Sequence, residues 1–465
     1  MFSKLRLEYS LVAVIFVAAT ALGQVTTGTP PFGSFGGGPF DTVNLGNLNV
    51  HFSVPIVNKA GRGIPFTYAL SYDSSIWVQV TTNGITSWSP TANWGWKGDT
   101  EIATGYVSNN QSNFLCDPRL GLYKTTFSGF VYHDPFGTSH AMGGAGWIDE
   151  CHNTTRNVVG GALDGSGYIV YFYVDGTGTN RVTSRTGSLI NPPYNLTTGA
   201  GKATDANGNQ ITTDGSGKFY DTLSSTAQVL TVAGTSPKTF TYTSPSGSRA
   251  YSLNYTAKNV WTSFGCSGIG EYQATNVLLV SSIGLPDGSQ YAFTYETSGT
   301  HSGYVTGRLA SVQLRTGGTI SYAYTGANGG INCTDGSTLG LTRTTPDSST
   351  PWTYSRSGSG STWTTTVTDP LTNATVINFE KDSSTTGPTN NFYETQRLVK
   401  QGSNTLSTTI TCYNGVNVGA PSSCYNTAVA SPISRTTAFH YLPTSSGSQA
   451  ETDTTYNTDG LVTEV

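Results

Sequence analysis

Bulky and polar residues alternate with a period of two through long stretches of this chain. In residues 48–54 the bulky side chains fall at every second position, and residues 66–72 repeat the pattern after a glycine-containing turn at 60–63. A period of two is that of a β-strand with one buried face. The two segments therefore predict a hairpin, whose apolar face carries Leu48, Val50, Phe52, Val54, Phe66, Tyr68, Leu70 and Tyr72.

The same form returns in the second half of the chain. Residues 251–255, 291–295 and 320–324 alternate bulky with small side chains, and each segment follows a turn that contains glycine. In the middle segment we expect the side chains of residues 291, 293 and 295 to share one face of a sheet. An imperfect recurrence of one hairpin-sized unit indicates a repeat architecture.

One of these hairpins can be placed in register from its side chains. A two-residue loop between residues 309–314 and 319–324 would put their bulky residues on opposite faces. A three-residue loop at 316–318 pairs Leu314 with Ile320 and Val312 with Tyr322, so that all of them lie on one side. Because a slip of one residue turns a whole face over, we expect the second register, with a glycine bulge in the loop.

Composition places the chain in the all-β class. Charged residues make up 11% of the 465 residues, against about 25% in an average soluble domain. Thr and Tyr favour strands, Gly and Asn favour turns, and the helix formers Glu, Lys and Met are scarce. We therefore predict many short antiparallel strands and hairpins in a large curved sheet. The net charge of −4 is not clustered, which argues against nucleic acid or an anionic membrane as the partner.

The N-terminus resembles a secretory signal peptide. Lys4 and Arg6 give it a positive start, an apolar run follows at 11–19, and small residues precede position 24. The run is too short for a transmembrane helix, and no later segment is apolar enough to cross a bilayer. We expect residues 1–23 to be removed and the chain to be secreted or displayed at the cell surface. An uncleaved membrane anchor is the alternative, because Glu8 interrupts the charged region.

Cysteine usage agrees with export. The count of six is even, and an oxidising compartment favours disulfides, for which six cysteines allow 15 pairings. We expect the sequential set because each bond would then close a local loop. No CxxC spacing is present, so zinc binding and thiol–redox chemistry have little support. The expected pairs are Cys116 with Cys151, Cys266 with Cys333, and Cys412 with Cys424.

Several phrases of the sequence resemble the bacterial YD-repeat, or RHS-repeat, family. Residues 48–75 are similar to the region that opens the repeat array in that family, with its G-R-G turn and LSYDS strand. The repeats are degenerate, since Glu296 or Asn457 stands where the family has Asp, and Leu461 follows Gly460 without the usual Arg. Other repeat-like phrases occupy residues 204–210, 285–295, 306–309, 368–371 and 456–463.

The resemblance implies a β-sheet that spirals into a hollow shell, which in related proteins encloses a toxin or presents a binding module. It divides the chain into a signal peptide at 1–23, a Gly/Pro-rich linker at 24–40, an N-terminal β domain at 41–200 and degenerate repeats at 201–465. The long C-terminal core of the family is lacking, so we expect an incomplete shell. A C-terminal continuation or an encapsulated toxin would be its partner.

Candidates for chemistry are few. His133, His140 and His152 lie near acidic residues, but their spacing is not that of a metal site, and we interpret them as polar residues of hairpins. Residues 205–216 resemble a calcium loop in their first positions only, since Gln210 replaces the required Gly. No G-x-S-x-G elbow is present. We therefore expect no catalytic residue, metal or cofactor, and no enzymatic activity.

The densest aromatic cluster is Trp77, Trp88, Trp94 and Trp96. Exposed Trp faces in an exported β-protein can stack on sugar rings, whereas buried ones pack in the core, which is the more frequent case. Two functions remain open. The first is a shell or scaffold segment of a cell-surface or polymorphic-toxin-type protein, and the second is a glycan-binding β-protein that acts through these tryptophans on a cell-surface glycan.

Overall fold

The computed structural model describes residues 20–21, 26–61, 63–97, 104–196, 198–384, 391–443 and 450–465. The chain is almost entirely β-sheet, which confirms the predicted all-β class. The proposed signal peptide, residues 1–23, lies outside the described residues except for strand β1 (Thr20–Ala21), whose backbone pairs with residues 80–81.

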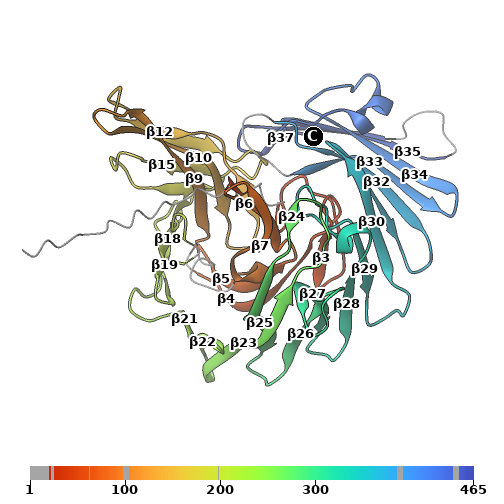
Figure 1. The fold of residues 1–465 in the computed structure, drawn as a ribbon, viewed down its shortest axis with the longest axis horizontal. Coiled ribbons are helices and arrows are strands. Elements are labelled where there is room, and N and C mark those ends of the chain that lie inside the picture. The colour runs from red at the N-terminus through yellow and green to blue at the C-terminus, as the bar shows by residue number, and fades with distance from the viewer. Residues whose placement is uncertain are drawn as a thin grey trace, which may run out of the picture.

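One antiparallel sheet dominates the fold and contains 23 strands in the described part of the chain. Its strands follow one another in sequence order and curve around the rest of the molecule (Figure 1). The strands are β14 (Val158–Gly161), β15 (Ile169–Phe172), β16 (Arg181–Thr183), β17 (Leu189–Asn191), β18 (Ala200–Thr204), β19 (Gln210–Asp214), β20 (Lys218–Asp221), β21 (Leu230–Ala233), β22 (Lys238–Ser244), β23 (Gly247–Trp261), β25 (Gln273–Gly284), β26 (Gln290–Thr297), β27 (Val305–Gln313), β28 (Thr319–Tyr324), β29 (Gly340–Thr344), β30 (Trp352–Ser359), β31 (Thr362–Thr368), β32 (Ala374–Lys381), β33 (Phe392–Gln401), β34 (Asn404–Tyr413), β35 (Arg435–Tyr441), β36 (Ala450–Tyr456) and β37 (Val462–Glu464).

Three smaller sheets are formed mainly by the first part of the chain. The N-terminal sheet contains β2 (Phe35–Gly37), β3 (Asp41–Asn44), β4 (Val50–Lys59), β5 (Phe66–Asp73) and β8 (Trp96–Lys97). A second sheet, here called the arm, contains β9 (Tyr106–Asp117), β10 (Leu122–His133), β11 (Ser139–Ala141), β12 (Gly146–Asp149) and β13 (Thr154–Arg156). The third joins β1 to β6 (Trp77–Thr82), β7 (Ile85–Pro90) and β24 (Ile269–Gly270). Strand β2 lies within the segment expected to be a linker, and the large sheet begins within residues 41–200.

The N-terminal sheet lies inside the curve of the large sheet (Figure 1). The predicted hairpin is present as β4 and β5, and its bulky side chains are buried. They share one continuous apolar core with the inward-facing residues of β19 to β33. Phe52, for example, stacks on Phe293 of β26, with ring centroids 6.1 Å apart. The space that the resemblance describes as hollow is therefore filled here by the chain's own N-terminal segment.

The predicted faces are confirmed, but one predicted register is wrong. Tyr291 packs against the core in which Phe293 and Tyr295 are buried. In the hairpin of β27 and β28, Val312 pairs with Ile320 rather than with Tyr322. The three-residue loop is 315–317, because the carbonyl of Gly318 accepts a hydrogen bond from the N–H of residue 314 at 2.7 Å. The loop lies one residue earlier than expected, and the shift preserves the parity that puts every bulky residue on the core side.

The end of the large sheet returns to its beginning. Gly460, in the turn between β36 and β37, lies so close to the carbonyl of Gly165 that an added Cβ would overlap it. An added Cβ on Gly167 would likewise overlap the carbonyl of Asp459. Phe32 packs edge-on against Tyr456 next to these turns, with ring centroids 5.1 Å apart. The strands therefore encircle the N-terminal sheet almost completely, and the two turns form the seam.

Helices are short wherever the structure describes the chain. Two are 3-10 turns, Ala92–Gly95 and Pro421–Asn426, and the third is α1 (Ala327–Gly330). None of these has the length and apolar character that a membrane-crossing helix needs.

Candidate functional site

The most elaborate polar site in the described residues joins the N-terminal sheet to the concave face of the large sheet. Asp41 of β3 is fully buried, and its carboxylate accepts two hydrogen bonds from the guanidinium of Arg343 on β29, at 2.7 and 2.5 Å. The hydroxyl of Tyr322 donates a third, at 2.8 Å. Burial and the neighbouring Asp41 raise the pKa of Tyr322 well above its ordinary value, so the phenol stays a donor. The site is therefore a closed ion pair with a structural role.

A second ion pair lies further along the same face. Arg308 of β27 donates to the carboxylate of Glu296 on β26, at 2.8 and 2.9 Å. Its guanidinium lies 4.0 Å from the ring centroid of Tyr324 and also donates to the carbonyl of Gly329 at 2.7 Å. This arginine therefore holds two strands and the turn of α1 together.

A third buried arginine has no carboxylate partner in the described part of the chain. Arg356 of β30 lies 3.7 Å above the ring of Trp363 and 4.6 Å from that of Phe392. It donates through Nη1 to the hydroxyl of Ser337 at 2.9 Å. Burial lowers its pKa to about 10, which still leaves it charged at neutral pH. Stacking between two aromatic rings is the main compensation for its lost hydration.

Single hydrogen bonds complete the contact between the N-terminal segment and the large sheet. The indole N–H of Trp77 donates to the carbonyl of Thr306 at 3.0 Å. The hydroxyl of Thr365 donates to the carbonyl of Leu45 at 2.7 Å. These bonds connect residues more than two hundred positions apart, so the inner and outer parts form one folded unit.

Three of the four predicted ligand-binding tryptophans belong to the core. Trp77, Trp88 and Trp96 are almost fully buried, so their faces cannot receive a sugar ring, and the core interpretation holds for them. Trp94 is half-buried and adopts a left-handed backbone conformation (φ 55°) between Asn93 (φ 53°) and a glycine. Strain of this kind persists only where surrounding packing enforces it.

A cavity of about 280 Å³ lies beside Trp94. It is bounded on one side by the 3-10 turn and β8, and on the other by strands of the large sheet. Its size is at the lower end of small-molecule sites. The lining residues are Asn93, Trp94, Trp96, Lys238, Leu253, Tyr255, Leu278, Leu279 and Val280. The structure thus brings two of the four predicted tryptophans to one cavity.

The three histidines do not form a metal site. His140 is buried between Asp164, 2.7 Å from Nδ1, and Asp134, 3.3 Å from Nε2. Burial lowers the pKa of His140, but the two carboxylates outweigh this effect and raise it to about 9. His133 bonds to serine hydroxyls, and burial lowers its pKa well below the ordinary value. His152 contacts Asp149 at the arm. His140 is therefore a buried group that ties β11 to the turn between β14 and β15, which contains Asp164.

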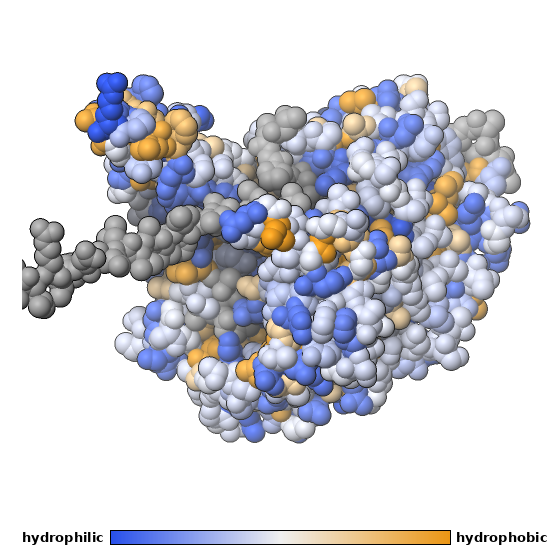
Figure 2. Space-filling model, viewed as in Figure 1, coloured by the Kyte–Doolittle hydropathy of each residue, from blue (hydrophilic) through white to orange (hydrophobic). Residues whose placement is uncertain are grey.

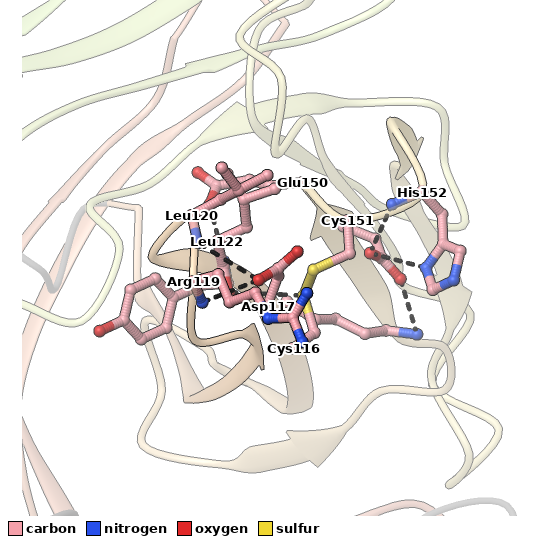
Figure 3. Close-up of a disulfide and its surroundings, with 11 residues drawn as sticks. Cys116, Asp117, Arg119, Leu120, Leu122, Glu150, Cys151 and His152 are labelled. Carbon is pink, nitrogen blue, oxygen red and sulfur yellow. Dashed lines mark hydrogen bonds and ion pairs between the residues drawn. A yellow bond between two sulfur atoms is a disulfide. The ribbon is translucent and has the colours of Figure 1, made fainter.

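The three predicted disulfides are present: Cys116–Cys151, Cys266–Cys333 and Cys412–Cys424. Figure 3 shows the first of them near the end of the arm, with Asp117, Arg119 and Glu150 around it. A carboxylate oxygen of Asp149 lies within 4.8 Å of both sulfur atoms. The sulfurs are bonded to each other, which removes the thiolates that a metal ion would need.

Sequence reasoning missed the buried charges. Arg343 and Arg356 lie on the inward faces of two strands in which apolar and polar side chains alternate. The residues two positions earlier, Leu341 and Tyr354, are buried on the same faces. The sequence signal for a buried charge is an arginine at a position where the alternation predicts a core residue. In a chain with so few charged residues, this signal stands out.

Comparison with known proteins adds no identity. No protein-family model matches the chain, and no curated protein matches it, so the likeness to YD-repeat proteins rests on the sequence phrases alone.

Proposed function

We propose that this chain is an exported, non-catalytic β-scaffold of the YD-repeat type, a shell segment of a cell-surface or toxin-carrying protein. One observation carries the proposal. The large sheet and the N-terminal sheet share a single core, and the buried charges on the concave face are engaged in ion pairs, hydrogen bonds or ring contacts that hold strands together. Such an arrangement serves to keep a large curved surface rigid.

A filled interior shifts the proposal toward display. A toxin carried by the shell would have to occupy space other than that taken by β3 to β5, and a C-terminal continuation would be one place for it. The convex face and the arm remain accessible for contact with a cell-surface partner. The chain contains few charged residues and many Thr, Ser and Asn residues, which suits a protein outside the cell.

Export and oxidation can be tested together. The full chain with a C-terminal affinity tag would be produced in a bacterium with a general secretory pathway, and the N-terminus and disulfides of the product would be read by mass spectrometry. Cleavage after residue 23 and three oxidised pairs outside the cytoplasm are expected. An uncleaved, reduced cytoplasmic product would contradict the proposal. Proteinase K treatment of intact cells would separate surface display from periplasmic location.

The cavity beside Trp94 favours one second candidate, binding of a cell-surface glycan. Trp94 offers a ring for stacking, and the polar residues Asn93 and Tyr255 are also part of the lining. Screening the folded chain on a glycan array, with Trp94→Ala as the comparison, tests this function. Glycan binding that is lost in the variant would support this function. If the unchanged chain binds no glycan, this second function is contradicted and the scaffold function is the one that stands.

A further inference from the structure

Large apolar side chains are exposed at the free end of the arm. Phe114 and Leu120 are 68% and 72% exposed, and Leu115 and Tyr123 are also exposed. All four lie within the hairpin of β9 and β10, which extends away from the body of the molecule (Figure 1). Figure 2 shows apolar residues gathered on this projection. Clusters of this kind on a polar protein mark a surface that meets an apolar partner.

The exposed residues lie on both faces of the tip and at its apex. In the β9–β10 register, Tyr123 pairs with Leu115 and Lys124 pairs with Phe114. Because neighbouring positions of a strand point to opposite faces, the first pair lies on one face and the second pair on the other. Leu120 lies in the turn at the apex. A groove on a protein would cover one face, whereas a lipid bilayer surrounds an inserted tip on all sides.

Aromatic and cationic side chains form the next layer toward the body. Trp147 of β12 pairs with Thr126, two residues beyond Lys124, and therefore lies about 7 Å further from the tip. The ammonium of Lys124 lies 5.2 Å from its ring, and the guanidinium of Arg156 lies 5.0 Å from it. Trp, Lys and Arg in this position are typical of the boundary between lipid tails and headgroups.

The acidic groups near the tip are occupied within the arm. The carboxylate of Asp117 accepts hydrogen bonds from the N–H groups of Arg119 and Leu120, at 2.8 and 3.2 Å. That of Glu150 accepts one from the N–H of Tyr123 at 2.8 Å. The guanidinium of Arg119 has no ion pair among the described residues and can meet a phosphate. Asp149 pairs with Lys124 at 3.4 Å, so the charges of the arm nearly balance.

The Cys116–Cys151 disulfide fixes the exposed tip. It ties the end of β9 to the turn between β12 and β13, as Figure 3 shows, and so prevents the hairpin from folding its apolar residues back onto the arm. Phe114 lies three residues before the end of β9 at Asp117, or about 10 Å along the strand, which is close to the depth at which interfacial segments lie in a bilayer.

From these observations we infer that the arm inserts its tip into the surface of a lipid bilayer. Insertion is driven by the four apolar side chains, and the layer of Trp147, Lys124 and Arg156 stops it at the headgroups. The balanced local charge and the net charge of −4 mean that anionic lipid adds little. The surface therefore recognises the bilayer itself and no particular headgroup.

Vesicle flotation of the full folded chain tests the inference. The lipid would be phosphatidylcholine alone, or phosphatidylcholine and phosphatidylglycerol mixed at about 7:3. The chain is expected to float with both, with partition coefficients within about threefold of each other. The double variant Phe114→Ser/Leu120→Ser is expected to partition about 100-fold less, because each exposed side chain contributes roughly tenfold.

A matched double variant controls for general loss of apolar surface. Ile85 is the first residue of β7 and Leu371 lies in the turn before β32; they are 71% and 80% exposed outside the arm. Ile85→Ser/Leu371→Ser is expected to float like the unchanged chain. Hydrogen exchange gives a second readout, in which vesicles slow the exchange of amides in residues 113–123. The inference is overturned if the unchanged chain stays with the lipid-free fraction, if the tip variant floats equally well, or if the control loses as much.

Discussion

Removal of the Asp41 carboxylate should show how much the contact between the N-terminal sheet and the large sheet contributes to stability. Asp41→Ala leaves the guanidinium of Arg343 buried without its partner and the hydroxyl of Tyr322 without its acceptor. The loss of one member of a buried ion pair costs about 3–5 kcal/mol, because the remaining charge stays desolvated. We expect a fall of about 4 kcal/mol in the free energy of unfolding.

That loss can be measured by thermal unfolding. At about 2.1 cal/mol/K of unfolding entropy per residue, 4 kcal/mol lowers Tm by about 4 °C if the 465 residues unfold together. The added change Arg343→Leu should restore part of the lost stability by removing the unpaired charge, and a double-mutant cycle gives the coupling energy of the pair.

The chain offers a matched surface pair as a control. Arg435 and Asp453 form the same two-bond ion pair, at 2.8 and 2.7 Å, but their side chains are 39% and 38% exposed. Asp453→Ala should lower the free energy of unfolding much less than Asp41→Ala does, because water solvates the remaining charge. If Asp41→Ala proves no more harmful than Asp453→Ala, the argument that the buried pair holds the inner sheet in place is refuted.

Three further variants test other parts of the structure. His140→Gln should lower the free energy of unfolding by on the order of 3 kcal/mol below pH 6.5, where His140 is charged in both the folded and the unfolded state. The loss should shrink as the pH rises through about 9, because His140 has a raised pKa in the folded state and loses its stabilising charge there. A difference in Tm that does not depend on pH would contradict this. Replacing Cys266 and Cys333 by Ser should lower the free energy of unfolding by about 4 kcal/mol, because their disulfide closes a loop of 67 residues. Urea unfolding of the two forms measures this loss, and equal midpoints would contradict the expectation. Gly307→Ala should destabilise the chain and change its Trp fluorescence, because Gly307 has a φ of +85° and an added Cβ would lie 2.7 Å from the ring of Trp94; an unchanged spectrum and Tm would show that the turn yields.

Local pattern was enough to predict the strands and their faces. The alternation in 48–54, 66–72 and 291–295 is a property of neighbouring residues, and burial of one face follows from it. The loop of the β27–β28 hairpin lies one residue earlier than predicted. The alternation of side chains fixes only which face is buried, whereas the hydrogen bonds of the turn fix where the loop lies. The disulfides were predictable for a similar reason, since each joins segments that are close along the chain.

The arrangement of the site could not be predicted in the same way. Whether Trp88 and Trp96 are exposed depends on which strands cover them, and those strands lie about two hundred residues later. The pairing of Asp41 with Arg343 likewise depends on how far the large sheet curves before it returns to the N-terminal sheet. Curvature accumulates over many strands, and no short segment of sequence encodes it.

The nearly closed path of the large sheet has a consequence for the order of folding. Asp41 meets its partner 302 residues later, and Thr26 donates to Asn391, which is 365 residues away. The hairpin of β4 and β5 is thus synthesised long before the strands that cover it. Its apolar face therefore stays exposed to solvent until those strands have been made. Contacts of such high sequence separation make folding slow. A chain that cannot complete its core until nearly all of it has emerged stays unfolded for longer, and an unfolded chain is the form that a narrow export channel can carry.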